Sequence, residues 1–283
     1  MRRHAPIIAA ALCAFVLPLA GCAQSLFFYP DQVERPSPSA FGLAYVESDF
    51  TSADGTALTG WFIPAIDPPR AHGTVIQFHG NAENMSSHWR LVEWLPAHGF
   101  NVFVFDYRGY GRSAGRPTPE GLADDSVAAV RHVASLPQVD PSRLFLLGQS
   151  LGGTNAIVAA ARPDCPPVAA IAIESTFRSY SSVANDKLFL AGSVMNDALS
   201  AERYLDDLPP VPIIFFHGTE DRVVSSHHSE SLYQSAREPK HLVLVAGCGH
   251  LEVFQEPFAA ENRAILEAFF LAAVKDDGAA NAR

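Results

Sequence analysis

A glycine-flanked serine between a strand-like run and a helix-like run constrains this chain more than any other feature. The apolar residues 144–147 lead directly into the run GQSLG at 148–152, and residues 154–158 continue it with helical character. Glycine is needed on both sides of the serine where a strand turns sharply into a helix, because larger side chains would collide with the crowded backbone. The pattern therefore predicts that Ser150 stands at the amino end of a helix, where backbone N–H groups and the helix dipole stabilise negative charge.

Strand-like and helix-like runs alternate through most of the remaining sequence. The strand-like runs are bounded by Gly, Pro or polar residues, and the later ones are continuously apolar, as in parallel sheets covered on both faces. The turn at residues 53–55 predicts an antiparallel start, and the alternation predicts a doubly wound α/β architecture. The eight expected strands cover residues 45–50, 57–63, 74–78, 101–105, 143–147, 168–173, 211–216 and 241–245, and the expected helices cover residues 87–98, 119–136, 151–161, 227–237 and 257–274.

In addition to the glycine-flanked turn at Ser150, other segments resemble the α/β-hydrolase superfamily, specifically its compact lysophospholipase and serine-aminopeptidase-like branch. The resemblance covers roughly residues 45–274. In that family an acid follows a late strand and a histidine follows the last strand. Here the run FHGTED ends in Asp221 and the run GCGH ends in His250. The resemblance implies an α/β-hydrolase fold, with an eight-stranded, mostly parallel sheet, helices on both faces and a small cap. It also implies Ser150 as nucleophile, His250 as general base and Asp221 as the acid that orients the imidazole.

The histidine can also be chosen from its position alone, whereas the acid has alternatives. Of the eleven histidines, His250 alone lies just beyond the last expected strand, in a glycine-rich loop. Glu174 closes the strand expected at 168–173, and some relatives carry their acid at the equivalent place. Asp221 itself has the residue type of a helix cap, and Glu220 is a neighbouring carboxylate.

A second serine, Ser113, also lies among glycines, in the run GYGRSAG at 109–115. No helix-like run follows it, so we expect a structural turn there. The family has a similar stretch, and the resemblance implies that Asp106 and Arg108 fix this loop without taking part in bond breaking.

The oxyanion hole is expected to consist of two backbone N–H groups. One belongs to Leu151, directly after the serine. The other lies in the run HGNA at 79–82, which resembles the family's His-Gly-x segment and points to the N–H of Asn81. We expect His79 to hold this loop by hydrogen bonds.

Residues 176–210 separate two core strands by more chain than one crossover helix requires, which predicts a small cap there. Its apolar residues fit either of two roles, the wall of an acyl-binding pocket or the packing of a replacement helix. They are Phe177, Tyr180, Leu188, Phe189, Leu190 and Met195.

The first residues have the pattern of a bacterial export signal. Two arginines precede an apolar stretch at 7–20 that is too short to span a bilayer as a mature anchor. It ends in LAGC, which resembles the lipobox of bacterial lipoproteins and implies cleavage before Cys22 and acylation of that cysteine. We therefore expect a signal peptide at 1–21, a lipidated tether at 22–43, a hydrolase domain at 44–275 and a disordered tail at 276–283. The expected location is the cell envelope, on the periplasmic face of the outer membrane.

Charge and spacing exclude other classes of protein. The formal net charge of −10 becomes −12 without the two signal-peptide arginines, and an acidic surface repels nucleic acid. The spacings Cys-x-x-Cys and His-Glu-x-x-His are absent, so we expect neither a metal nor another cofactor.

The sequence therefore predicts hydrolysis of a small acyl ester or thioester by a membrane-anchored serine enzyme. The alternatives are amide or peptide cleavage of the serine-aminopeptidase type, and a non-catalytic envelope scaffold that kept the fold.

Overall fold

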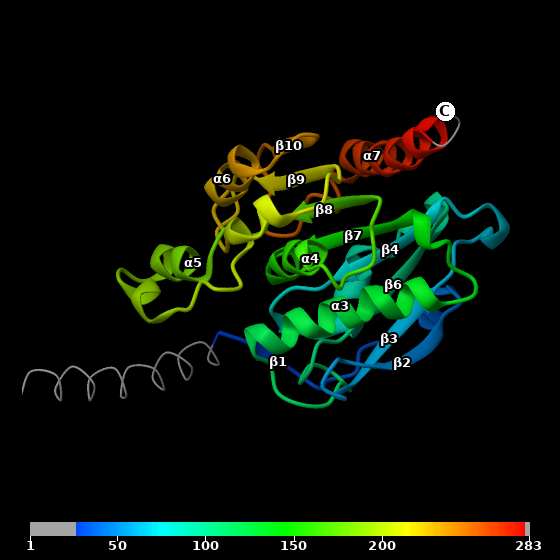
Figure 1. Cartoon of the computed structure of the whole chain (residues 1–283), viewed down its shortest axis with the longest axis horizontal. Coiled ribbons are helices and arrows are strands. Elements are labelled where there is room, and N and C mark those ends of the chain that lie inside the picture. Colours follow the sequence, from blue (N-terminus) through cyan, green and yellow to red (C-terminus); the bar gives the residue numbers. More distant parts are fainter. Residues whose placement is uncertain (1–26, 281–283) are drawn as a thin grey trace, which may run out of the picture.

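The computed structural model describes residues 27–280, which form a single central sheet with helices on both sides (Figure 1). The sheet runs in the order β10-β9-β8-β7-β4-β6-β3-β2. β3 pairs antiparallel with β2 and β6, and all other neighbours pair in parallel. The predicted eight-stranded, mostly parallel sheet is confirmed. Its strands are β2 (Val46–Thr51), β3 (Ala57–Ile63), β4 (Gly73–Phe78), β6 (Phe100–Phe105), β7 (Leu144–Gln149), β8 (Ala170–Glu174), β9 (Ile213–Gly218) and β10 (Lys240–Val245).

The continuous apolar runs supply two hydrophobic cores, one on each face of the sheet. In β7, Leu144 and Leu146 belong to one core, whereas Phe145 and Leu147 belong to the other, because successive side chains point to opposite faces. Helices α3 and α4 cross in front of the sheet in Figure 1 and pack on the first core together with α6, and α7 packs on the second. These helices are α3 (Pro119–Ser135), α4 (Leu151–Ala161), α6 (His227–Ser235) and α7 (Ala259–Ala280).

The helix expected at 87–98 is wrong as a single element. The structure has a short helix α2 (Met85–His88) followed by two separate 3₁₀ turns, Trp89–Leu91 and Leu95–His98. Pro96 has no N–H to continue an α-helical ladder, and Leu95 instead donates to the carbonyl three residues back, at 3.0 Å. Pro96 therefore interrupts a continuous helix across 87–98.

The expected tether is also wrong where the structure describes it, because residues 29–41 lie along the domain. β1 (Tyr29–Pro30) pairs in parallel with β5 (Ala82–Glu83). Asn84 donates to the Asp31 carboxylate at 2.6 Å, and Arg35 forms ion pairs with Asp31 and Glu83. The charged residues Asp31 and Arg35 thus bind partners on the loop after β4, which holds the segment against the domain.

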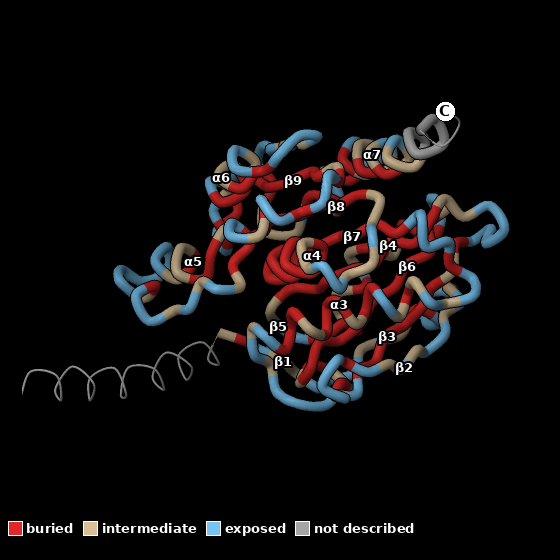
Figure 2. The backbone as a smooth tube through the Cα atoms, in the orientation of Figure 1, coloured by how far each residue is buried: buried red, intermediate tan, exposed pale blue. Residues whose placement is uncertain are grey.

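The segment between β8 and β9 forms the predicted cap. It consists of α5 (Tyr180–Lys187) and the 3₁₀ turns Ala191–Val194, Ala201–Arg203 and Leu205–Asp207. Figure 2 shows that its outer part is exposed while the sheet is buried.

At the carboxyl terminus, helix α7 continues to residue 280, through most of the tail that was expected to be disordered. The expected signal peptide and Cys22 lie outside the described residues. Within the described range, no helix combines the length and apolar character needed to cross a bilayer.

Candidate active site

Ser150 occupies a strained turn between β7 and α4. Its backbone has φ 54° and ψ −121°, a combination that costs a non-glycine residue free energy and is found where function requires it. The turn is fixed on both sides, since the N–H of Ser150 donates to the Glu174 carbonyl at 2.9 Å and its carbonyl accepts from the Thr176 hydroxyl at 2.9 Å. Leu151 is the first residue of α4, so the helix offers its N–H no partner.

The glycines of the motif are required by close packing around this turn. A Cβ on Gly152 would collide with the carbonyl of Phe78, and a Cβ on Gly148 would lie 2.5 Å from the Cα of Gly153. The turn thus needs glycine at both positions, as the sequence pattern predicted.

His250 and Asp221 meet at the same edge of the sheet as Ser150. The three residues follow the carboxyl ends of β10, β9 and β7, which are parallel strands of one sheet. Nδ1 of His250 lies 2.7 Å from Oδ2 of Asp221, and the aspartate side chain is fully buried. Because Nδ1 donates to the carboxylate, Nε2 of His250 carries a lone pair that can accept a proton.

The Asp221 carboxylate is surrounded by donors. Oδ1 accepts the N–H groups of Val223 and Val224 at 2.8 and 2.9 Å, so the capping role weighed from the sequence coexists with the contact to His250. Nε2 of His217 lies 3.3 Å from Oδ2. Burial alone would raise the pKa of Asp221, but the hydrogen bonds from His217 and His250 outweigh it and hold the pKa well below its ordinary value. Asp221 is therefore ionised at neutral pH.

Glu174, the alternative acid, has other hydrogen-bond partners. Gln77 donates to Gln149 at 2.6 Å, Gln149 donates to one oxygen of Glu174 at 2.6 Å, and the N–H of Val253 donates to the other oxygen at 3.1 Å. Burial raises the pKa of Glu174 to about 7. This chain of buried polar groups joins the residue before Ser150 to the loop after His250, so Glu174 fixes the position of one relative to the other.

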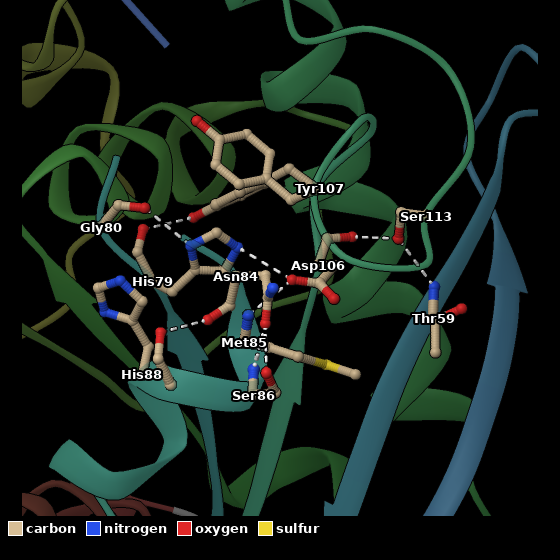
Figure 3. A network of polar contacts seen from close by, with 12 residues as sticks. Thr59, His79, Gly80, Asn84, Met85, Ser86, His88, Asp106, Tyr107 and Ser113 are labelled. Atoms are coloured by element: carbon tan, nitrogen blue, oxygen red, sulfur yellow. Dashed lines mark hydrogen bonds and ion pairs between the residues drawn. The ribbon is translucent and has the colours of Figure 1, made fainter. Parts of the chain in front are cut away.

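The loop after β4 lies against the serine. A Cβ added to Gly80 would be 3.6 Å from the Cβ of Ser150. Nδ1 of His79 lies 2.8 Å from the carbonyl oxygen of Gly80, and this carbonyl belongs to the same peptide group as the N–H of Asn81 (Figure 3). His79 therefore orients the peptide that carries the predicted oxyanion donor, which agrees with the holding role expected for it.

The protonation state of His79 follows from its surroundings. Its side chain is buried, and burial together with the nearby His88 lowers its pKa to about 3. Its Nε2 faces Oδ1 of Asp106 at 3.6 Å, and burial raises the pKa of Asp106 to about 7 (Figure 3). His79 is thus neutral near pH 7, with its proton on Nδ1 where it can donate to Gly80.

Ser113, the second serine among glycines, has a structural role. Its hydroxyl donates to the Asp106 carbonyl at 2.7 Å and accepts the N–H of Thr59 at 3.0 Å (Figure 3). Arg108 in the same stretch forms an ion pair with the buried Asp125 at 2.8 Å. The expected turn is confirmed.

An apolar cavity of about 510 Å³ opens beside Ser150, between the loop after β4 and the cap. Asn81 and Ser150 form its polar end. Of the six apolar cap residues named from the sequence, three line the cavity, Tyr180 is buried in the core, and Phe189 and Leu190 are exposed. The main apolar lining residues are Phe27, Phe177, Val183, Leu188, Val194 and Met195.

Similarity to known proteins agrees with this geometry. The family model described as serine aminopeptidase, S33, matches residues 69–200. The uncharacterized protein YfhR of Escherichia coli K12 is 40% identical over 268 residues, which cover 93% of this chain and 92% of that one. The α/β-hydrolase domain-containing protein WAV2 of Arabidopsis thaliana is 31% identical over 223 residues, covering 72% and 71%. The chain belongs to the α/β-hydrolase superfamily.

Among solved structures, the esterase Pf2001 of Pyrococcus furiosus superposes on this α/β-hydrolase with a TM-score of 0.72. The superposition covers 86% of this chain and 97% of the esterase. At 21% identity the likeness concerns the fold.

One group of metal-ligand residue types exists in the described part of this α/β-hydrolase. Asp186 of α5 and the neighbours His227 and His228 of α6 bring their ligand atoms within 4.8 Å of one another. Nδ1 of His228 accepts the N–H of Arg178 at 3.4 Å, and its Nε2 lies 2.9 Å from Oδ2 of Asp186. Burial, and then the charge of His227, lower the pKa of His228 to about 4.

Since His228 is neutral and its Nδ1 is an acceptor, the ring proton lies on Nε2 and is donated to Asp186. No lone pair on His228 is left for a metal in this arrangement. The group instead ties the cap helix α5 to α6. Spacing in the sequence gave no sign of it, because the two helices come together only in the folded α/β-hydrolase.

Sequence reasoning also missed Phe27, which lines the cavity and packs edge-on against Tyr180 with ring centroids 5.2 Å apart. Nothing in a local pattern links residue 27 with a cap more than 150 positions away. The available signal is that the run at 26–29 is too apolar to move freely in water. It favours packing on the domain over the membrane interface, but does not say where on the domain.

Proposed function

We propose that this α/β-hydrolase cleaves a carboxylic ester or thioester through an acyl-enzyme on Ser150. One observation carries the proposal. A serine in a strained turn lines an apolar cavity, at the sheet edge where a histidine and an ionised aspartate form a hydrogen-bonded pair.

In the proposed reaction, Oγ of Ser150 attacks the acyl carbonyl carbon while its proton passes to Nε2 of His250. The imidazolium that forms is stabilised by the Asp221 carboxylate at Nδ1. His250 then gives the proton to the departing alcohol or thiol. In the second half, His250 takes a proton from water, the water oxygen attacks the acyl carbon, and the proton returns to Ser150 as the acid leaves.

The negative charge on the carbonyl oxygen is stabilised in this proposal by the N–H groups of Leu151 and Asn81. The first lies at the amino end of α4, and the second belongs to the peptide that His79 orients. Preorganised donors of this kind contribute roughly 3 to 4 kcal/mol each in the transition state.

The cavity favours an acyl chain over a charged amine. Among its described lining residues none is acidic, and the only charged one is Lys187. A site that selects peptides by their amino terminus needs a negative partner for the ammonium group, since an unpaired charge is costly to bury. The amide-cleaving alternative therefore has less support than hydrolysis of a short-to-medium acyl ester.

A panel of p-nitrophenyl esters and aminoacyl anilides, assayed with native protein and with Ser150→Ala, tests the proposal. We expect ester hydrolysis that disappears in the variant, and little anilide cleavage. Preferred cleavage of anilides would favour the amide alternative. No turnover of any substrate would favour the envelope scaffold.

We also propose that Cys22 is acylated and holds the protein at the bacterial envelope, on the periplasmic face of the outer membrane. The support is the apolar run at 7–20 that ends in LAGC. Metabolic labelling with an alkyne fatty acid should mark the native chain and spare Cys22→Ala. Equal labelling of both would contradict the assignment.

A further inference from the structure

The outer end of the cap carries three consecutive large apolar side chains in water. We call Leu188, Phe189 and Leu190 the cap tip, and they are exposed by 70%, 85% and 63%. Contiguous exposed apolar surface of this kind marks an interaction site in most soluble domains.

The cap tip is an ordered turn. Leu190 has a φ of 66°, a left-handed conformation that is unfavourable for leucine. The N–H of Ala191 donates to the Leu188 carbonyl at 2.9 Å, and that of Ser193 donates to the Leu190 carbonyl at 3.0 Å. The backbone thus bears strain in a turn that presents these side chains to the outside.

The cap tip adjoins the cavity that contains Ser150 through Leu188. Leu188 lines that cavity, and so do Val194 and Val223, which are exposed by 46% and 50%. The apolar surface therefore continues from the outside of the molecule to the proposed nucleophile without a polar break among these residues.

The chain enters the domain at the same place. Phe27, the first described residue, lines the cavity and packs against the rings of Phe177 and Tyr180. Figure 1 shows β1, which follows it, on the side of the molecule where α5 projects. Cys22 lies five positions earlier. Five extended residues span at most about 17 Å.

An anchor at Cys22 would therefore hold Phe27, which packs against Phe177 and Tyr180, within about 17 Å of the membrane surface. We propose that the cap tip inserts into the lipid leaflet that carries this anchor, so that the cavity receives its acyl substrate from the bilayer. The inference rests on the proposed acylation of Cys22. It does not require that Ser150 has the proposed reaction.

Local charge fits insertion into the apolar part of the leaflet. The exposed Lys187 and Arg222 beside the cap tip are balanced by the exposed Asp186 and Glu220, and the whole chain is acidic. Docking is thus driven by apolar burial, and high salt should leave it intact.

Depth-dependent fluorescence quenching tests the proposal. Full-length protein, processed in a bacterial host, is reconstituted into phosphatidylcholine vesicles whose acyl chains carry bromine, with Phe189→Trp as the reporter. Ile66→Trp is the matched control, because Ile66 is 68% exposed and lies near Pro96, at the opposite edge of the sheet. The parent protein supplies the background of the three native tryptophans.

We expect the emission of F189W to shift to the blue and to be strongly quenched by the brominated lipid, at low and high salt. The I66W reporter should show neither change. Absence of quenching at 189 would overturn the proposal. A blue shift without quenching that grows with protein concentration would also overturn it, since a second copy of the chain would then cover the cap tip.

A kinetic arm separates this proposal from the proposed function. Phe189→Ser combined with Leu190→Ser changes the cap tip outside the cavity lining. This variant should reduce hydrolysis of esters embedded in vesicles by roughly tenfold or more, and leave a water-soluble acetyl ester unchanged. If no ester is hydrolysed by the native protein, the proposed function fails while the quenching result still decides membrane docking. Equal loss on both esters would contradict the docking role of the cap tip.

Discussion

The region at the carboxyl ends of the parallel strands and the cap differ in burial and in how their side chains are held. At the strand ends, Ser150, Glu174 and Asp221 are buried and fixed by hydrogen bonds to strands and neighbouring loops. The cap consists of the short helix α5 and 3₁₀ turns, and its outer side chains are exposed. In the proposed reaction, the sheet edge would determine which bond is broken, whereas the cap would determine which acyl group reaches it.

The largest effect is expected from removing the proposed base. His250→Ala should lower kcat by about 10⁵- to 10⁶-fold, because the serine then has no proton acceptor. Ester hydrolysis by purified protein measures the loss, and circular dichroism checks the fold. His241→Ala, an exposed histidine on β10, is the control and should keep native activity. Similar activity in both variants would place the base elsewhere.

The two buried carboxyls provide the next test. Asp221→Asn should lower kcat by about 10⁴-fold, since the imidazole loses the carboxylate that sets its tautomer. Glu174→Gln should cost far less, because Glu174 bonds to Gln149 and Val253. Kinetics of both variants at one pH compare them directly. The reverse order would show that Glu174, the last residue of β8, is the acid.

A cap substitution should alter selectivity while leaving the chemistry intact. Ala191→Phe places a ring in the cavity and is expected to lower kcat/KM for medium-length acyl esters by roughly 10- to 100-fold. An acetyl ester should be cleaved as before. A chain-length series of p-nitrophenyl esters measures the change, and a uniform loss at all lengths would contradict the division between cap and strand ends.

The smallest effect concerns stability and its dependence on pH. Burial raises the pKa of Glu174 from 4.5 to about 7, so the folded state holds a proton that the unfolded state releases. Its contribution to stability is full below pH 4.5 and is lost as pH rises through about 7. Urea unfolding across this range should show a steeper decline in native protein than in Glu174→Gln. A steeper decline in the variant would contradict the assigned proton.

Asp106, whose pKa burial raises to about 7, contributes in the same direction, and Asp221, with its lowered pKa, contributes in the opposite one. Both are present in native protein and in Glu174→Gln. The difference between the two unfolding profiles therefore isolates Glu174.

Much of the strand-end region was predictable because its signals are local. Apolar runs such as residues 144–147 determine the strands, and GQSLG determines the turn at Ser150. The choice between Asp221 and Glu174 was not local, since it depends on which strand end His250 approaches. Pro96, by contrast, is a local signal, because a proline inside the helix expected at 87–98 removes one N–H from its hydrogen-bond ladder.

The contacts of the N-terminal segment were harder to predict from the sequence. Its prolines are typical of an extended, semi-rigid tether, yet Asp31 and Arg35 have partners at residues 83 and 84. Phe27 contacts a cap that begins after β8. Such pairings depend on where the completed sheet places distant loops.

The central claim is that the strained serine becomes acylated with the help of His250. Mass spectrometry of the protein treated with a fluorophosphonate ester tests it most directly. The account predicts a single adduct on the peptide that contains Ser150, unchanged in Ser113→Ala and strongly slowed in His250→Ala. An adduct on another residue, or none on the folded native protein, would contradict it.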